Sequence, residues 1–250
     1  MIKYKIYPSV LDAFNNYLCA EDVWMQYWGN SENPSMTLED FQVKTFNDLM
    51  DTINRVESEP SEPASRGTCF NEIVDCLIAK RKPDFPCERV VDGLTTFYEC
   101  QFDGFTFRFP LNVCSWFAKY YDGAMSQVKV SAVLDTCHGD VELYGYIDEL
   151  MPLSVHDIKT TGSYSFPKFK DHAQHLVYPY CLRKNGNDIS RFEYNILLLP
   201  KYGSPEIHTE VYVFDDERDI PILRQDVEDF IDFLEINRRL ITNKKIFNNE

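Results

Sequence analysis

Hydrophobic residues recur every three to four positions in two stretches near the start of the chain. This spacing predicts one helix over about 9–28 and another over about 37–57. The acidic Pro/Ser segment 58–63 that follows is typical of a connecting loop. We therefore expect a helical N-terminal region of residues 1–60, followed by a second part over residues 61–250.

The second part alternates between helical spacing and the two-residue alternation of strands. Helices are predicted over 68–79, 111–121, 168–184 and 220–243, a hairpin over 97–109 that turns at Asp103-Gly104, and strands over 127–134, 141–150, 153–160, 191–199 and 207–214. This order predicts an α/β (α+β) fold with a central mixed β-sheet flanked by helices. We expect the 141–160 hairpin at the centre of the sheet, between the helices 67–80 and 168–184.

The composition is that of a chain that can bury a full core. Of its 250 residues, 44% are hydrophobic, which suits one domain with a helical attachment. No apolar run reaches membrane-spanning length and no secretory leader is recognisable, so we expect a cytoplasmic protein without a membrane partner. The eight cysteines lack CxxC or CxxxC spacing, which favours reduced thiols over a zinc or iron–sulfur site.

The net charge of −15 works against a nucleic-acid partner, because phosphate neutralisation supplies most non-specific affinity. The charge is uneven, however. Residues 1–66 hold five Lys or Arg against eleven Asp or Glu, whereas residues 159–201 hold seven against three. A local basic surface can outweigh the acidic whole, since salt limits the reach of distant charges to about 8 Å.

The chemistry of the chain is concentrated in the predicted hairpin. Residues 157 and 159 lie two apart on one strand, so Asp157 and Lys159 share a face that the preceding strand can join through Asp148. Carboxylate oxygens suit Mg²⁺, and phosphodiester hydrolysis needs a hard cation and an oriented water beside the phosphate. Lys159 fits the role of orienting or activating that water. Taken singly, the residues are better explained as ordinary charges, Asp148 as an acid at the end of the hairpin and Asp157 with Lys159 as a solvated pair on the strand; the case for chemistry depends on their combination.

Three motifs occur once each in the chain, in order and within 34 residues: Gly145-x-x-Asp148, Asp157-Ile158-Lys159 and Gln174-x-x-x-Tyr178. With them the sequence resembles the RecB-like branch of the PD-(D/E)XK nucleases, which includes phage recombination exonucleases. The resemblance covers about residues 64–200 and rests on GYIDEL, DIKTT, KFKDHAQHLVYPY and the upstream Arg66-Gly67-Thr68.

The resemblance implies a restriction-endonuclease-like core and assigns roles to individual residues. Asp148 and Asp157 would bind metal, and Ile158 would add its main-chain carbonyl. Gln174 and Tyr178, one helical turn apart, would position DNA or order the site, although ordinary helix packing also accounts for Tyr178. Lys168 and Lys170 are candidates for phosphate contacts, or else a solvated helix start.

One departure concerns the upstream metal ligands. Where the family has a His and a later Glu, this chain has Asn71 and Asp75, with Glu72 adjacent. An Asn carbonyl is still a hard ligand, so Mg²⁺ would be bound more weakly rather than lost. We favour Asp75 to complete the ligand set, with Asn71 and Glu72 as alternatives. The relatives with an iron–sulfur cluster are disfavoured, because no cysteine follows Cys181.

The sequence therefore predicts a DNA nuclease that uses Mg²⁺ or Mn²⁺. The leading hypothesis is an exonuclease of recombination or repair, with a phage among the expected sources and a recombination protein as a further partner. A structure-specific endonuclease and a catalytically inactive DNA-binding or assembly protein of the same fold are the alternatives. Polarity, strand preference, processivity and oligomeric state are left open.

Overall fold

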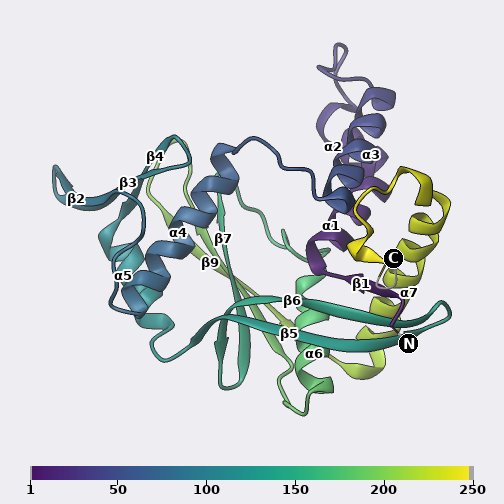
Figure 1. Cartoon of the computed structure of the whole chain (residues 1–250). Coiled ribbons are helices and arrows are strands. Elements are labelled where there is room, and N and C mark those ends of the chain that lie inside the picture. The colour runs from purple at the N-terminus through teal and green to yellow at the C-terminus, as the bar shows by residue number, and fades with distance from the viewer. Residues whose placement is uncertain (1, 248–250) are drawn as a thin grey trace.

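The computed structural model describes residues 2–247, which form two β-sheets with helices around them (Figure 1). The large sheet contains β1 (Tyr4–Ile6), β5 (Met125–Thr136), β6 (Gly139–Met151), β7 (Ser154–Thr161), β8 (Arg191–Leu198) and β9 (Glu206–Val213). Its order is β1-β6-β7-β8-β9, with β5 also paired to β6. The β1–β6 and β7–β8 pairs are parallel and the others antiparallel. The predicted mixed central sheet is therefore confirmed, and the β6–β7 hairpin is at its centre.

Helices cover both faces of this sheet. They are α1 (Pro8–Leu18), α2 (Ala20–Trp28), α3 (Leu38–Asn54), α4 (Glu62–Ile78), α5 (Leu111–Tyr120), α6 (Gln174–Lys184) and α7 (Asp216–Ile236), followed by 3-10 turns at Arg238–Leu240 and Lys244–Ile246. In Figure 1, α4 and α5 lie at one end beside a small sheet, whereas α1, α2, α3 and α7 lie at the other. The small sheet contains β2 (Cys87–Asp92), β3 (Thr95–Phe102) and β4 (Phe105–Pro110).

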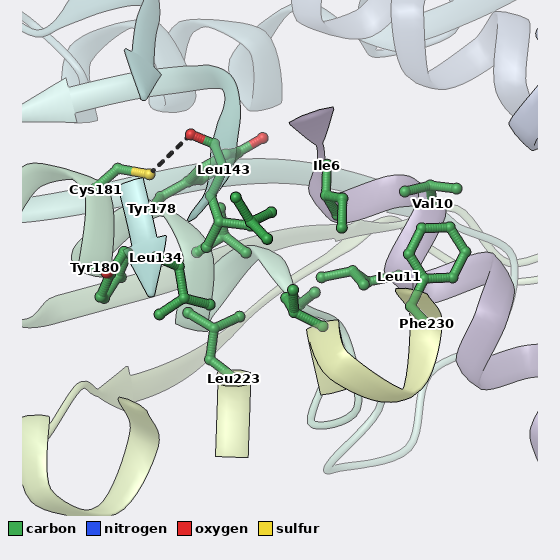
Figure 2. Packing of buried hydrophobic residues seen from close by; sticks show 14 of the residues in the cluster. Ile6, Val10, Leu11, Leu134, Leu143, Tyr178, Tyr180, Cys181, Leu223 and Phe230 are labelled. Atoms are coloured by element: carbon green, nitrogen blue, oxygen red, sulfur yellow. Dashed lines mark hydrogen bonds between the residues drawn. The ribbon is translucent and has the colours of Figure 1, made fainter. Parts of the chain in front are cut away.

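The main core lies between the large sheet and α1, α6 and α7 (Figure 2). Leu11 from α1 and Leu223 from α7 are buried there together with Leu134 and Leu143 of the sheet. The thiol of Cys181 in α6 donates to the Leu143 carbonyl, 3.7 Å away. Because α1 contributes to this core and β1 joins the sheet, the N-terminal region packs as part of the whole. A second cluster joins α4 and α5 to the small sheet and to Ile158.

The edge of β6 is divided between two partners. β1 pairs with residues 141–143 and β7 pairs with residues 149–151, while β5 runs along the opposite edge. In the described chain, no strand pairs with the stretch 144–148 on the divided edge. The β5 ladder is also interrupted at Asp148, opposite which Gln127 adopts a positive φ of 54°. Asp148 therefore lies at a gap where β6 and β7 diverge.

Several element boundaries differ from the sequence-based expectation. The helix predicted over 9–28 is two helices, because the backbone leaves helical geometry at Cys19. The helix predicted from 168 begins only at Gln174, since the Lys168 and Phe169 amides donate to the Glu210 carboxylate instead of continuing a helix. Lys168 and Lys170 are thus in a loop before α6.

The remaining differences are at the other elements. The predicted loop 58–63 already contains the start of α4, and the closing helix occupies Asp216–Ile236 instead of 220–243. The short strands β1 and β2 were not predicted. Across β2 and β3, Cys87 and Cys100 are paired in register with their Sγ atoms 3.0 Å apart, and all eight cysteines are free. Among residues 2–247, no helix is both long enough and apolar enough to span a bilayer.

Candidate active site

The gap between β6 and β7 brings three of the predicted residues together. Asp148 is fixed there by two hydrogen bonds to its Oδ2 atom. The main-chain amide of Ile158 donates across the gap at 3.2 Å, and the side-chain amide of Asn71 donates from α4 at 3.3 Å. Since Ile158 directly follows Asp157, the contact holds the β6 acid next to the β7 acid. The structure therefore brings Asp148 and Asp157, which we expected to converge, together with Asn71, one of the three upstream candidates.

Asp157, Lys159 and Gln174 form a closed polar triangle. Asp157 and Lys159 point to the same face of β7, and Lys159 Nζ lies 2.8 Å from Asp157 Oδ2. Gln174, the first residue of α6, donates from Nε2 to Asp157 Oδ1 and accepts from Lys159 Nζ at 2.9 Å. The amide thus contacts both charges, the carboxylate through its NH₂ group and the ammonium through its carbonyl oxygen. Asp157 is 3% exposed, so its charge has little access to water.

Burial and charge together perturb the titration of this group. Burial, followed by the nearby charge of Asp157, raises the pKa of Asp148 to about 7. Burial acts to lower the pKa of Lys159, but the charge and hydrogen bond of Asp157 outweigh it, so the pKa is raised. Two carboxylates share a poorly hydrated site with one ammonium. Such a site favours the binding of an additional cation.

Tyr178 is buried and acts on the site through packing. It is 5% exposed on α6, and its ring lies directly over Gly145 of β6. A Cβ added at Gly145 would be 2.6 Å from Tyr178 Cε1, so no larger residue fits without a shift. Gly145 of the Gly-x-x-Asp motif therefore makes room for Tyr178 of the Gln-x-x-x-Tyr motif. This arrangement holds α6, and with it Gln174, against β6 three residues before Asp148.

The three upstream candidates on α4 have different surroundings. Asn71 alone donates a hydrogen bond to Asp148. The Glu72 carboxylate is bound by both terminal nitrogens of Arg81, at 2.5 and 3.0 Å. Asp75, which we favoured from the sequence, lies beside the buried Glu149, and burial, followed by the side-chain contact with Asp75, raises the pKa of Glu149 to about 8. The contacts thus favour Asn71 over Asp75 and Glu72.

The oxygen atoms at the gap are suited to a divalent cation. Asn71 Oδ1 is buried without a hydrogen-bond partner, which is costly for a polar atom in a protein interior, and Asp157 Oδ2 contacts the Lys159 ammonium at 2.8 Å. In residues 2–247, no three His, Cys, Asp or Glu side chains are close enough to form a metal site alone. Amide and main-chain oxygens would therefore have to complete the set. Two carboxylates with neutral oxygens match the preference of Mg²⁺.

The two predicted phosphate-binding lysines lie on the loop before α6, and both are exposed. Lys168 Nζ donates to Thr161 Oγ1 at 2.6 Å and to the Ser163 carbonyl at 2.7 Å. Thr161 follows Lys159 by two residues on the same face of β7. The Lys168 ammonium, which is bound to Thr161, therefore lies about 7 Å from Lys159 along the strand. Lys170 instead borders a cavity of about 250 Å³ beside α1.

Two residues that support the site were not predicted. Asp12 of α1 accepts from the Ala173 amide at 2.7 Å and so holds the start of α6. The ring of Tyr194 on β8 lies below the Lys159 ammonium, with the centroid 5.7 Å from Nζ. Tyr194 is aligned with Asp157 in the parallel β7–β8 ladder. Neither residue is part of a recognisable motif, so only the tertiary structure identifies them.

The histidines near the predicted site are not part of the polar triangle. His156 faces α5 and is 1% exposed, with Nε2 2.7 Å from Ser154 Oγ and Nδ1 3.0 Å from Asn195 Oδ1. His172 lies 3.3 Å from Asp12 Oδ2, and His175 stacks on the ring of Tyr212. The hydrogen bonds of His156 occupy both of its ring nitrogens, whereas Nδ1 of His175 is buried without a hydrogen-bond partner.

Comparison with known proteins gives only distant likeness. No protein-family model matches the sequence, and no curated protein does. Among solved structures, SSO0001 is similar with a TM-score of 0.46 and 11% identity, over 93% of this chain and 78% of that one. A protein from Eubacterium rectale that is provisionally named an exonuclease is similar with a TM-score of 0.45 and 15% identity, over 73% of this chain and 71% of that one.

Proposed function

We propose that this protein is a metal-dependent DNA nuclease that hydrolyses phosphodiester bonds at the gap between β6 and β7, and that it acts as an exonuclease. The observation that carries the proposal is the closed contact of Asp157, Lys159 and Gln174 beside Asp148. Two acids and one ammonium are held there by hydrogen bonds from three different elements. Such pre-organisation is expected of a catalytic site and is costly for a purely structural one.

Each residue has a distinct role in this proposal. Asp148, Asp157, Asn71 and the Ile158 carbonyl would hold Mg²⁺ or Mn²⁺. When bound, the ion would neutralise charge that develops on the phosphate during hydrolysis. Lys159 supplies a fixed ammonium that donates hydrogen bonds to the phosphate or to the attacking water. Gln174 holds the side chains of Lys159 and Asp157 beside each other through its hydrogen bonds to both, and Tyr178 holds Gln174 in position.

Two alternatives differ in what they predict for DNA. A structure-specific endonuclease with the same site would nick closed circular DNA, whereas an exonuclease requires an end. An inactive DNA-binding scaffold would bind DNA without cleaving it. End-labelled linear DNA and closed circular DNA, each incubated with Mg²⁺ or Mn²⁺, therefore separate the three functions. We expect labelled nucleotides to be released from the linear DNA and the closed circular DNA to stay intact.

Substitution at Lys159 and Asp148 tests the roles of these residues. Lys159→Ala should lose most turnover while keeping DNA affinity, because its contact with phosphate strengthens only as charge develops in the transition state. Asp148→Ala should lose cleavage together with the part of DNA affinity that depends on the metal. Turnover of Lys159→Ala at the parental rate, in a preparation free of contaminating nuclease, would contradict the mechanism.

The ligand set predicts how activity depends on the metal. We expect activity with Mg²⁺ or Mn²⁺ but not with Ca²⁺, whose coordination is longer and looser. Mn²⁺ should give the higher rate at low metal concentration if Asn71 is a weak ligand, since Mg²⁺ demands near-ideal octahedral geometry. Asn71→His should then lower the metal concentration needed for half-maximal rate. An unchanged requirement would remove Asn71 from the ligand set.

A further inference from the structure

One face of the β5–β6 ribbon carries aromatic rings that the core does not use. The other face is buried against α6 and α7 through residues such as Val130, Leu143 and Ile147. On the unburied face, the register places Tyr146 opposite Lys129 and Tyr144 opposite Ser131. Tyr146 is 54% exposed.

This face leads along the strand to the candidate active site. Tyr144 and Tyr146 precede Asp148 on β6 by four and two residues, and strand side chains alternate between faces. Tyr146 is therefore about 7 Å from Asp148 along the strand, and Tyr144 is about twice as far. The edge of β6 over this stretch has no partner strand within the described chain. The rings thus lie on the approach to Asp148, with no neighbouring strand between them.

Positive charge accompanies the rings although the chain as a whole is acidic. Lys129 is exposed beside Tyr146 and forms no salt bridge with any residue in the part of the chain that the structure describes. Arg55, at the end of α3, donates to the Tyr144 hydroxyl at 2.6 Å. Of the acids on the same face, Glu142 is paired with Lys5 at 3.1 Å, and Asp135 and Asp140 lie opposite each other at the end of the ribbon far from Asp148. Two cationic side chains, Lys129 and Arg55, therefore lie beside the aromatic rings.

We propose that this face, defined by Tyr144, Tyr146, Lys129 and Arg55, binds single-stranded DNA and delivers it to Asp148. Bases would stack on Tyr146, and Lys129 and Arg55 would contact phosphates. Aromatic platforms flanked by cations bind single strands without sequence preference, because every base has a stacking face. Paired bases keep their faces inside the duplex, so the platform selects unpaired strands. The identity of the strand as substrate rests on the proposed nuclease function.

Binding can be measured without any cleavage. The intact chain, kept free of divalent metal by a chelator, is titrated into a fluorescent oligothymidylate of about 12 nucleotides, a length within the range that single-strand binding modules occupy. A blunt duplex of the same length is the comparison. Tyr146→Ala should weaken single-strand binding on the order of tenfold. Tyr146→Trp should retain it, because stacking needs the ring and not the hydroxyl.

Matched variants distinguish stacking from general surface effects. Tyr27→Ala removes a tyrosine that is 70% exposed on α2 and should leave affinity unchanged. Lys129→Ala should reduce the slope of log affinity against log salt by about 0.7, the contribution of one phosphate contact on a single strand. Duplex binding should change less than single-strand binding in both the Tyr146 and the Lys129 variants.

The outcomes separate this proposal from the nuclease function. Parental affinity in both Tyr146→Ala and Lys129→Ala, equal losses for single strand and duplex, or a parent protein that does not bind the oligonucleotide at low salt would overturn it. Cleavage of DNA by the parent together with any of these results would leave the nuclease function intact. Conversely, a parent that binds through Tyr146 but never cleaves DNA would contradict only the nuclease function.

Discussion

At the scale of single residues, Gly145 shows how one missing side chain supports the site. Alanine there would put its Cβ 2.6 Å from the Tyr178 ring, so either β6 or α6 must move. We expect Gly145→Ala to lower the free energy of unfolding by about 1–3 kcal/mol, the usual cost of overpacking, and to reduce turnover. Urea denaturation and a DNA cleavage assay measure the two effects.

The control for this substitution is Gly162→Ala, where the nearest atom to the added Cβ is the Leu199 carbonyl oxygen at 3.9 Å. That variant should match the parent in stability. Adding Tyr178→Leu to Gly145→Ala should recover stability if the clash with the ring is the cause. A double variant as unstable as Gly145→Ala alone would show that the cause lies in the backbone of β6.

His175 gives a prediction about pH. Burial lowers its pKa to about 4, so the folded protein keeps His175 neutral while the unfolded chain protonates it near 6.5. Its contribution to stability is present above pH 6.5 and is lost as the pH falls from 6.5 towards 4. His175→Phe, which keeps a ring to stack on Tyr212, should therefore weaken the loss of stability over this range.

Urea denaturation at pH 7.5 and pH 5 measures this dependence. His208→Phe is the matched control, because its ring also stacks on a tyrosine, with centroids 4.5 Å apart. We expect the control to lose stability between the two pH values as the parent does. A parental loss in His175→Phe would assign the pH dependence to other groups.

At the scale of elements, the start of α6 depends on a residue far away in sequence. Asp12 of α1 accepts from the Ala173 amide, as an N-cap side chain would. Asp12→Ala should cost about 0.5–2 kcal/mol and speed hydrogen exchange in the first turn of α6. Because that turn carries Gln174, turnover should also fall. Asp12→Asn keeps an acceptor and should restore the exchange protection; failure to do so would point to the charge of Asp12 instead.

The elements also show what a sequence can reveal about such a fold. Long strands and helices were predictable because their apolar spacing is sustained over several residues. β1 has only three residues and exists through pairing with 141–143, which no local pattern encodes. The delayed start of α6 depends on Glu210, whose carboxylate binds the Lys168 and Phe169 amides. Both are tertiary effects that override local preference.

The candidate site was predictable to a similar extent. Asp148, Asp157, Lys159 and Gln174 were identified because strand alternation and short motifs are local properties of the sequence. The preference for Asp75 over Asn71 was not supported by the contacts, since the partner of Asp75 is Glu149, which no motif includes. The exposure of Tyr146 was not predictable in this way, because it depends on which face of β6 the helices leave uncovered.

At the scale of the whole molecule, the site is a source of instability that a cation should relieve. Burial and the charge of Asp157 raise the pKa of Asp148 to about 7, so at pH 8 its carboxylate destabilises the folded state. Asp148→Asn should therefore raise the melting temperature in metal-free buffer. In the parent, a metal at one hundred times its dissociation constant should add about 2.7 kcal/mol, which Asp148→Asn should lose.

Thermal unfolding at pH 8 with and without Mn²⁺ measures both effects. Asp84→Asn, at an exposed position, is the control and should keep the metal response of the parent. Equal metal-induced shifts in the parent and in Asp148→Asn would place the bound metal elsewhere. A lower melting temperature for metal-free Asp148→Asn would mean that its hydrogen bonds outweigh its charge.

The pairing of β1 with β6 also bears on the order in which the chain folds. β1 forms a parallel pair with residues more than a hundred positions later, and Tyr4 additionally bridges Phe247 near the other end of the sequence (Figure 1). Such contacts close very long loops, whose entropic cost must be met before the contacts stabilise the chain. We expect the β5–β6–β7 meander to form early and β1 to dock last. Pulsed hydrogen exchange during refolding should then protect the amides of β5 and β6 before those of Tyr4–Ile6.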